Sequence, residues 1–300
     1  MNKSFSGSTK LVKEPNFSSL TAKIEMQEPP SIQKSTSMKP WGKRIIIGGL
    51  PRSGSTLLRF MLDRAPSILA GPETNFFRMP LWHCQAKIDD VSSYISSKFK
   101  INQDDIRAAI NSSHTSVEAF DKIITSYRDA NSPTANIWAE KSPNNCYSYH
   151  RLLAENSELY FISTVRHGLD VVTSKIKNHP VNSDYWCPIQ RYIDDCTAVA
   201  NFSHHRHFIL SYEDLVTTPT KTAKELFSFL EIDFEESCLT DFNAKSPTRD
   251  LTKVNQEKLK GPLSSQWVDR WRDSEHTEKV IEFKKNSQAM RWLNHFEYKA

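Results

Sequence analysis

The sequence lacks any run of apolar residues that could cross a membrane as a helix, which takes about 20 such residues in succession. Its opening segment, MNKSFSGSTKLVKEPNFSSL, also lacks the apolar core of a secretory signal peptide. Both absences argue against secretion and against a membrane anchor. They predict a cytoplasmic protein that makes no contact with a membrane.

Cysteine is scarce, and neither sign of charge dominates. The five cysteines (Cys84, Cys146, Cys187, Cys196 and Cys238) are widely spaced and form no Cys-x-x-Cys pair. This pattern indicates neither a disulfide framework nor a zinc site, so we expect buried free thiols. The net charge of +4 allows an anionic ligand but does not indicate a nucleic-acid-binding protein, whose basic residues are denser. Nothing in the composition indicates an oligomeric state.

The chain divides by composition near residue 40. Residues 1–40 are rich in serine, lysine and proline and have no regular apolar period. Such segments bury too little apolar surface to fold, so we expect a flexible N-terminal tail. Residues 41–300 contain no recognisable linker. At 38% hydrophobic residues, the chain can bury a large core, and we expect a single domain over 41–300.

Beyond residue 42, β-branched and aromatic runs alternate with amphipathic segments. We predict strands over 43–47, 68–70, 136–139, 159–165 and 207–212, and helices over 55–62, 147–156, 169–177 and 220–230. This alternation predicts an α/β fold in which helices cover both faces of a parallel sheet. The mainly helical pattern over 76–127 is interpreted as an insertion that roofs an acceptor pocket. Trp267 and Trp271 have helical spacing, which predicts that both rings pack from one helix.

A glycine-rich segment follows the first predicted strand. Gly49-Leu-Pro-Arg-Ser-Gly-Ser-Thr56 has the spacing of a phosphate-binding loop that opens into a helix. The backbone N–H groups of such a loop and the positive end of the helix together hold a phosphate. A nucleotide-hydrolysing loop has lysine where Ser55 stands here. Because that lysine is absent and Arg52 lies three positions earlier, the loop favours a phosphate ester or phosphosulfate over Mg-ATP.

A second anion-binding segment, YFISTVRHGLDVVTS at 160–174, leads from a predicted strand into a predicted helix. Arg166 stands at the end of the strand, where its side chain can hold a phosphate through two parallel hydrogen bonds. The hydroxyl of Ser174, about two helical turns later, is placed to reach the same anion. We therefore predict a second phosphate site around Arg166.

These two segments resemble the phosphate-binding motifs of sulfotransferases. PRSGSTLLRFML at 51–62 is similar to their 5′-phosphosulfate loop, and VRHGLDVVTS at 165–174 is similar to their 3′-phosphate motif. GPET at 71–74, KSP at 141–143 and YEDL at 212–215 match, in order, the subgroup of tyrosylprotein and many bacterial sulfotransferases. The resemblance implies a P-loop NTPase-like sulfotransferase fold with a helical insertion. It also implies 3′-phosphoadenosine 5′-phosphosulfate (PAPS) as donor and adenosine 3′,5′-bisphosphate (PAP) as product.

The resemblance further implies a role for each matched residue. Glu73 would be the catalytic base, and Arg52 and Lys141 would offset charge near the transferring group. The nucleotide would be bound by Arg52, Ser53, Gly54, Ser55, Thr56 and Leu57 in the loop, by Arg166 and Ser174 at the 3′-phosphate, and by Tyr212. Thr252 and Lys260 resemble the last nucleotide-covering segment of the family only loosely, and they complete the predicted set.

The predicted chemistry requires a base for the acceptor's proton and cations for the leaving oxygen, but no metal. His204, His205 and His207 cannot easily share an ion, since adjacent strand residues point to opposite faces. His83 is an alternative base, although an isolated histidine is more often a packing residue.

The residues that flank the predicted base bear on the acceptor. Pro72 and Asn75 replace an acidic and a basic residue of the members that act on protein tyrosines, which disfavours a tyrosine peptide. We therefore expect sulfation of a hydroxyl or amine on a small molecule, such as a specialised natural product. Two other functions stay open at this point: a P-loop kinase that uses ATP, and a nucleotide-binding module without catalysis.

Overall fold

The computed structural model describes residues 40–78, 85–174, 187–240 and 263–299. His83, Cys84, Thr252 and Lys260 lie outside these ranges, as does the expected N-terminal tail apart from Pro40. Within the described ranges, no helix is both long enough and apolar enough to cross a membrane.

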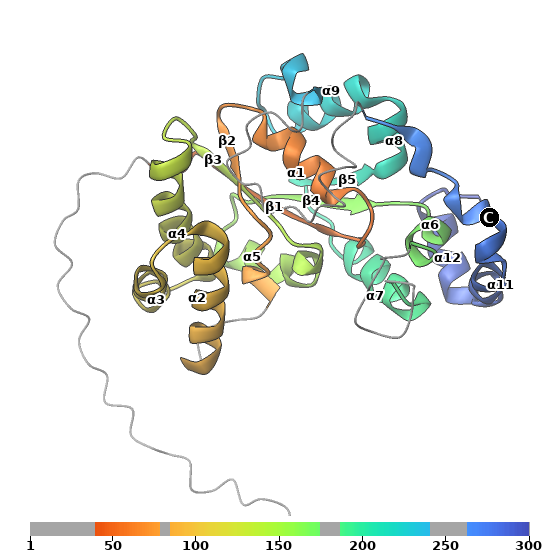
Figure 1. Cartoon of the computed structure of the whole chain (residues 1–300), viewed down its shortest axis with the longest axis horizontal. Coiled ribbons are helices and arrows are strands. Elements are labelled where there is room, and N and C mark those ends of the chain that lie inside the picture. Colours follow the sequence, from red (N-terminus) through yellow and green to blue (C-terminus); the bar gives the residue numbers. More distant parts are fainter. Residues whose placement is uncertain (1–39, 79–84, 175–186, 241–262, 300) are drawn as a thin grey trace, which may run out of the picture. The chain divides into compact units, whose positions relative to one another are not determined.

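In the described part of the chain, five parallel strands form one sheet (Figure 1). They are β1 (Lys43–Gly49), β2 (Ile68–Ala70), β3 (Ile137–Lys141), β4 (Tyr160–Val165) and β5 (His207–Ser211). Their order across the sheet is β2-β3-β1-β4-β5. All five predicted strands are confirmed, with ends that differ by at most a few residues.

Helices cover both faces of this sheet. Ile45 and Ile47 of β1 pack with α1 (Ser55–Asp63) and α9 (Pro219–Phe229) on one face. Ile46 points to the opposite face, where α4 (Ser116–Asn131), α5 (Tyr149–Glu155) and α7 (Ile189–Ala200) pack. In Figure 1 the first pair of helices lies above the strands, and α5 and α7 lie below them. Successive strand residues point to opposite faces of the sheet, and both faces are buried under helices. This is typical of a parallel sheet, so the predicted α/β fold class is confirmed.

The remaining helices flank these layers. They are α2 (Gln85–Phe99), α3 (Gln103–Asn111), α6 (Gly168–Val172), α8 (Tyr212–Thr217), α11 (Thr277–Lys285) and α12 (Ser287–His295). The segment that follows Phe76 is helical as predicted, since it contains α2, α3 and α4. Part of it belongs to the core, because the rings of Phe120 in α4 and Trp138 in β3 meet edge to face with centroids 4.9 Å apart.

Three helix predictions need correction. The helix predicted over 147–156 is divided into a 3₁₀ helix, η3 (Pro143–Ser148), and α5, because Asn145 donates a hydrogen bond to the Ile47 carbonyl and ties this turn to β1. The helix predicted over 169–177 ends at Val172 as α6. The expectation that Trp267 and Trp271 share a helix is wrong. They lie in the separate 3₁₀ helices η5 (Ser265–Trp267) and η6 (Arg270–Arg272), since Val268 is extended and Asp269 is left-handed with φ of 62°.

The four cysteines in the described ranges are free and buried, as predicted. Burial raises the pKa of the Cys146 and Cys187 thiols to about 12, so both stay protonated at neutral pH. Neither thiol is therefore a candidate nucleophile.

Candidate active site

The carboxyl ends of the parallel strands meet at one edge of the sheet, and each sequence motif follows one of these ends. The glycine-rich loop follows the central strand β1. The GPET and KSP segments follow β2 and β3 on one side of it, and Arg166 and Tyr212 follow β4 and β5 on the other. The candidate site therefore has two halves with the loop between them.

The glycine-rich loop is held against the end of β4. Gly49 has φ of 112°, and a Cβ atom there would lie 2.4 Å from the carbonyl oxygen of Thr164. Only glycine tolerates that approach. The Leu50 N–H donates to the same carbonyl at 2.9 Å, and the buried Ser53 hydroxyl lies 2.6 Å from the Thr164 hydroxyl. Ser53 also donates to the Leu50 carbonyl, so its hydroxyl holds the loop in shape rather than facing a ligand.

The loop ends at the N-terminus of α1. Gly54 is the N-cap residue, has φ of 81° and offers no side chain to the first turn of the helix. The first intrahelical bond is donated by Leu58 to the Gly54 carbonyl, so the N–H groups of residues 55–57 have no carbonyl within the helix to bond. An uncapped helix N-terminus that follows a glycine-rich loop is a suitable site for an anion.

Arg52 stands in the loop with its backbone in the left-handed region, at φ of 63°. That conformation costs a residue other than glycine about 1–2 kcal/mol, which the surrounding structure must offset. Its Nε donates to the Ser174 hydroxyl at 2.9 Å. Burial and the neighbouring Arg166 guanidinium both lower the pKa of Arg52 from its ordinary value. Two guanidinium groups that repel each other in a partly buried place favour an anion between them.

Arg166 lies at the end of β4, almost buried. Its Nη1 donates to the Arg52 carbonyl at 3.0 Å, and its guanidinium carbon lies 4.5 Å from the centre of the Tyr212 ring. Its Nε is buried and has no hydrogen-bond partner among the described residues. An unpaired buried donor is costly, and an arginine fork of this kind matches the oxygens of a phosphate. Arg52, Arg166 and Ser174, predicted from the sequence as anion-binding residues, are thus brought together.

Tyr212 completes this half of the site. It begins α8, and its ring packs on the loop so closely that a Cβ atom at Gly54 would lie 2.6 Å from it. The predicted nucleotide contact therefore stands at the start of a helix and beside the phosphate loop. The next residue, Glu213, was not singled out from the sequence. Its carboxylate accepts the His167 N–H at 3.0 Å and the Tyr298 hydroxyl at 2.7 Å, which fixes the chain just beyond Arg166.

Glu73 and Lys141 form the other half of the site. The Lys141 ammonium donates directly to the Glu73 carboxylate, although Lys141 is the last residue of β3 and Glu73 lies on the segment that follows β2. Lys141 is nearly buried, with 6% of its side chain exposed, whereas 39% of the Glu73 side chain is exposed. The carboxylate is therefore held by a fixed cation and still accessible to an incoming molecule. The predicted base and cation are direct partners.

Glu140 is a site-supporting residue that sequence reasoning missed. Its carboxylate is buried and accepts the N–H and the hydroxyl of Thr74 at 3.2 and 2.7 Å. It also accepts the Ser142 hydroxyl at 2.7 Å and the Asn145 amide at 2.5 Å. Burial raises its pKa. The available signal was an acidic residue inside IWAEK, a run that a central parallel strand buries entirely.

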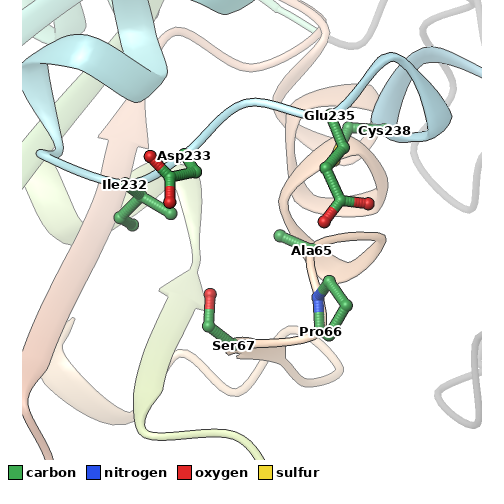
Figure 2. Close-up of a pocket in the computed structure, with 7 residues that line it drawn as sticks. All are labelled: Ala65, Pro66, Ser67, Ile232, Asp233, Glu235 and Cys238. Atoms are coloured by element: carbon green, nitrogen blue, oxygen red, sulfur yellow. The ribbon is translucent and has the colours of Figure 1, made fainter.

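Two other features lie apart from these motif segments. A pocket of about 220 Å³ is lined by residues 65–67, which precede β2, and by Ile232, Asp233, Glu235 and Cys238 (Figure 2). It therefore adjoins the opposite, amino-terminal edge of the sheet. Within the described ranges, one group of potential metal ligands, Asp273, Glu275 and His276, lies at the 3₁₀ helix η7 (Ser274–His276) rather than in any motif segment.

Comparison with known proteins agrees with the motifs. A model described as the sulfotransferase family matches residues 44–236. The chain is similar to the sulfotransferase domain of an olefin synthase from Synechococcus PCC 7002, with 20% identity, 90% of this chain and 99% of that one covered, and a TM-score of 0.61. It is also similar to the sulfotransferase domain from the curacin biosynthetic pathway, with 18% identity, 88% and 99% covered, and a TM-score of 0.55. At these identities, both structures show a shared fold. No curated protein sequence matches the chain.

Proposed function

The chain belongs to the sulfotransferase family, and from that premise we propose that it transfers a sulfuryl group from PAPS to a hydroxyl or amine of a small-molecule acceptor. The observation that carries the proposal is the arrangement at the carboxyl edge of the sheet. One side of the loop holds an arginine pair, of which Arg166 is buried and Arg52 partly buried, and the other holds an accessible carboxylate that is fixed by a lysine.

The residues of the first half fit the donor nucleotide. The N–H groups at the start of α1 and the Arg52 guanidinium would hold the 5′-phosphosulfate. Arg166 and Ser174 would hold the 3′-phosphate, and the unpaired Nε of Arg166 supports this assignment because a phosphate oxygen would satisfy it. Tyr212 would lie beside the nucleotide. Contacts from Thr252 and Lys260 stay a prediction, since both residues lie outside the described ranges.

The second half fits the chemistry of transfer. The bond between sulfur and the bridging phosphate oxygen breaks while the acceptor's oxygen or nitrogen attacks the sulfur in line, and PAP departs. Glu73 would take the acceptor's proton as that bond forms. Lys141 and Arg52 would stabilise the negative charge that develops on the bridging oxygen. Together these side chains would accept the acceptor's proton and stabilise the leaving oxygen, the two requirements of the reaction.

The kinase alternative is less well supported. A P-loop kinase needs a lysine at the start of its helix to reach the β- and γ-phosphates, and Ser55 occupies that position. The family match also favours sulfuryl over phosphoryl transfer. A nucleotide-binding module without catalysis would need the arginine pair but not the Glu73–Lys141 pair, so turnover distinguishes it from the enzyme.

A small-molecule acceptor is supported by Pro72 and Asn75, which differ from the residues that flank the base in enzymes acting on protein tyrosines. The two solved domains that the chain resembles belong to an olefin synthase and to a biosynthetic pathway, and a metabolite acceptor fits that setting. We propose that the enzyme acts in the cytoplasm, where such acceptors diffuse.

Calorimetric titration without metal tests the proposal directly. We expect PAP to bind much more tightly than AMP or ATP, because only PAP has both a 5′-phosphate for Arg52 and a 3′-phosphate for Arg166. Turnover of PAPS with a panel of hydroxyl and amine acceptors then follows. A preference for Mg-ATP would refute the sulfotransferase assignment, and tight PAP binding without any turnover would favour a binding module.

A further inference from the structure

A second buried charge adjoins the proposed 3′-phosphate site. Asp170, one helical turn after Arg166, has a side chain with no solvent exposure, and its Oδ2 lies 3.4 Å from the Arg166 Nη2. Its two carboxylate oxygens also accept backbone N–H groups from a distant part of the chain. Oδ2 accepts from Asp269 and Oδ1 accepts from Trp271, each at 3.0 Å.

The same distant segment also contacts the arginine. The Arg166 Nη2 donates to the Trp267 carbonyl, so the segment 267–271 bonds to both members of the Arg166–Asp170 pair. The Trp271 ring adds a stacking contact on His167, with centroids 5.4 Å apart and planes at 13°. About a hundred residues of chain separate the partners, so these bonds hold a tertiary contact rather than a local turn.

In this arrangement the nitrogens of Arg166 have different partners. Nη1 donates to the Arg52 carbonyl, and Nη2 donates to the Trp267 carbonyl and lies beside Asp170. No side chain or backbone group in the described part of the chain accepts from Nε, so this donor can serve a ligand. A guanidinium is a rigid plane, so a carboxylate that fixes one edge also fixes the direction of the others.

We propose that Asp170 is a positioning residue: it orients Arg166 toward the 3′-phosphate and docks segment 267–271 on the same guanidinium, so that docking and 3′-phosphate binding are coupled. This inference rests on the proposed function, since it takes Arg166 as the 3′-phosphate ligand. Coupling of this kind is reciprocal. The bound 3′-phosphate favours the docked segment, and the docked segment favours the 3′-phosphate.

The affinities of PAP and AMP in the full-length chain test the positioning role, because AMP lacks only the 3′-phosphate. In Asp170→Asn we expect the affinity for PAP to fall about 10- to 100-fold, since an amide cannot accept both backbone N–H groups and orients the arginine less firmly. The affinity for AMP should hardly change. Simple electrostatics predicts the opposite result, since loss of a negative charge near the phosphate favours an anion. Unchanged or tighter PAP binding would therefore overturn the proposal.

A matched control is present in α7. Asp195 is also fully buried and pairs with the arginine four residues before it, at 2.8 Å from Arg191. Asp195→Asn should destabilise the fold to a similar degree but leave the ratio of PAP to AMP affinity unchanged. An equal fall in that ratio in both variants would show that general destabilisation, not positioning, is responsible.

Hydrogen–deuterium exchange tests the coupling in the wild-type chain, so it does not depend on folding of a variant. PAP at saturation should slow exchange of the Asp269 and Trp271 amides about fivefold or more relative to saturating AMP.

A variant gives a second test of the coupling. Trp271→Ala, which leaves Arg166 and Asp170 in place but weakens docking, should lower the ratio of PAP to AMP affinity. Equal protection by PAP and AMP, or an unchanged ratio in Trp271→Ala, would refute the coupling. Failure of the wild type to distinguish PAP from AMP would instead refute the proposed function.

Discussion

At the scale of single residues, the candidate site contains two pairs of side chains, for which we propose different roles: one pair in the chemical step and one in phosphate binding. Glu73 and Lys141 bond to each other, and Arg52 and Arg166 converge on the far side of the loop. The left-handed backbone of Arg52 and the Arg166 Nε, which has no hydrogen-bond partner among the described residues, both belong to the pair proposed for phosphate binding. Substitutions in the two pairs should therefore affect different measured quantities.

Glu73→Gln should lose most of the transfer and keep the nucleotide. Because the amide cannot take a proton from the acceptor, we expect kcat to fall about 10²- to 10⁴-fold, with little change in PAP affinity. Steady-state kinetics with an acceptor identified by screening, together with calorimetry, measure both quantities. Glu158→Gln is a suitable control, since that exposed carboxylate pairs with Arg206 at the surface. A parallel loss of PAP affinity in Glu73→Gln would contradict its role as the base.

Arg166→Ala should chiefly weaken nucleotide binding and should also lower stability. It removes the proposed ligand of the 3′-phosphate and leaves Asp170 buried without a charged partner, which typically costs about 3–5 kcal/mol of folding free energy. Arg191→Ala leaves the buried Asp195 without its charged partner in the same way, and it serves as the control for stability alone. The Tm of thermal unfolding should fall in both variants, whereas the preference for PAP over AMP should fall only in Arg166→Ala. A preserved preference would exclude Arg166 as the 3′-phosphate ligand.

At the scale of elements, the position of Glu73 and Lys141 depends on the junction of β3 with the segments that follow β2 and β3. Glu140 accepts hydrogen bonds from Thr74 and Ser142, the residues next to Glu73 and Lys141. It points to the opposite side of β3 from Lys141, since neighbouring strand residues alternate. The buried Glu140 carboxylate thus holds the backbone next to both members of the proposed catalytic pair.

Glu140→Gln should lower kcat about 10- to 100-fold without loss of PAP affinity, because small misplacement of a catalytic pair is costly. The double variant Glu73→Gln/Glu140→Gln should be no slower than Glu73→Gln alone, since the two residues act through one pair. Glu155→Gln is the matched control: Glu155 also accepts several hydrogen bonds, from Ser116 and Val117, but it supports the start of α4. Additive losses in the double variant would show that Glu140 acts on something other than the pair.

The same substitution predicts a pH dependence of stability. The pKa of Glu140 is raised in the folded protein above its ordinary value of 4.5. Stability is therefore highest below the unfolded pKa and is lost as pH rises toward the folded pKa, by up to about 1.4 kcal/mol per pH unit. The free energy of unfolding of wild type relative to Glu140→Gln should accordingly fall as pH rises above about 4.5. Denaturant unfolding across this range measures it, and a rising difference would contradict the raised pKa.

The elements that carry the motifs were predictable because their signals are local. The Ile45–Ile47 run, the glycine spacing and the position of Arg166 at a strand end each follow from adjacent residues. Glu140 and Asp170 were missed because their partners come from other elements, up to about a hundred residues away. Helical spacing misplaced Trp267 and Trp271 because the tertiary contacts of Asp170 hold that segment in separate turns.

At the scale of the whole molecule, the nucleotide would bind along one half of the sheet, from the central strand β1 to the edge strand β5. The loop after β1, the end of β4 and the start of α8 after β5 all face it, so a bound nucleotide links three adjacent strands of the five. A ligand that binds only the folded state stabilises it by about 2.7 kcal/mol at a concentration 100 times its Kd. For a domain of this size, that corresponds to an increase in Tm of about 5–10 °C.

This stabilisation should not depend on the N-terminal segment. All five sequence motifs, and the glycine-rich loop that begins at Gly49, lie beyond residue 48, and the family match begins at residue 44. Deletion of residues 1–39 should therefore leave the PAP affinity and the PAP-induced rise in Tm unchanged, as expected for a tail that adds nothing to the site. Differential scanning calorimetry of the full and shortened chains, each with PAP at the same multiple of its own Kd, makes the comparison. A shortened chain that binds PAP several-fold more weakly would show instead that the N-terminal segment forms part of the nucleotide site.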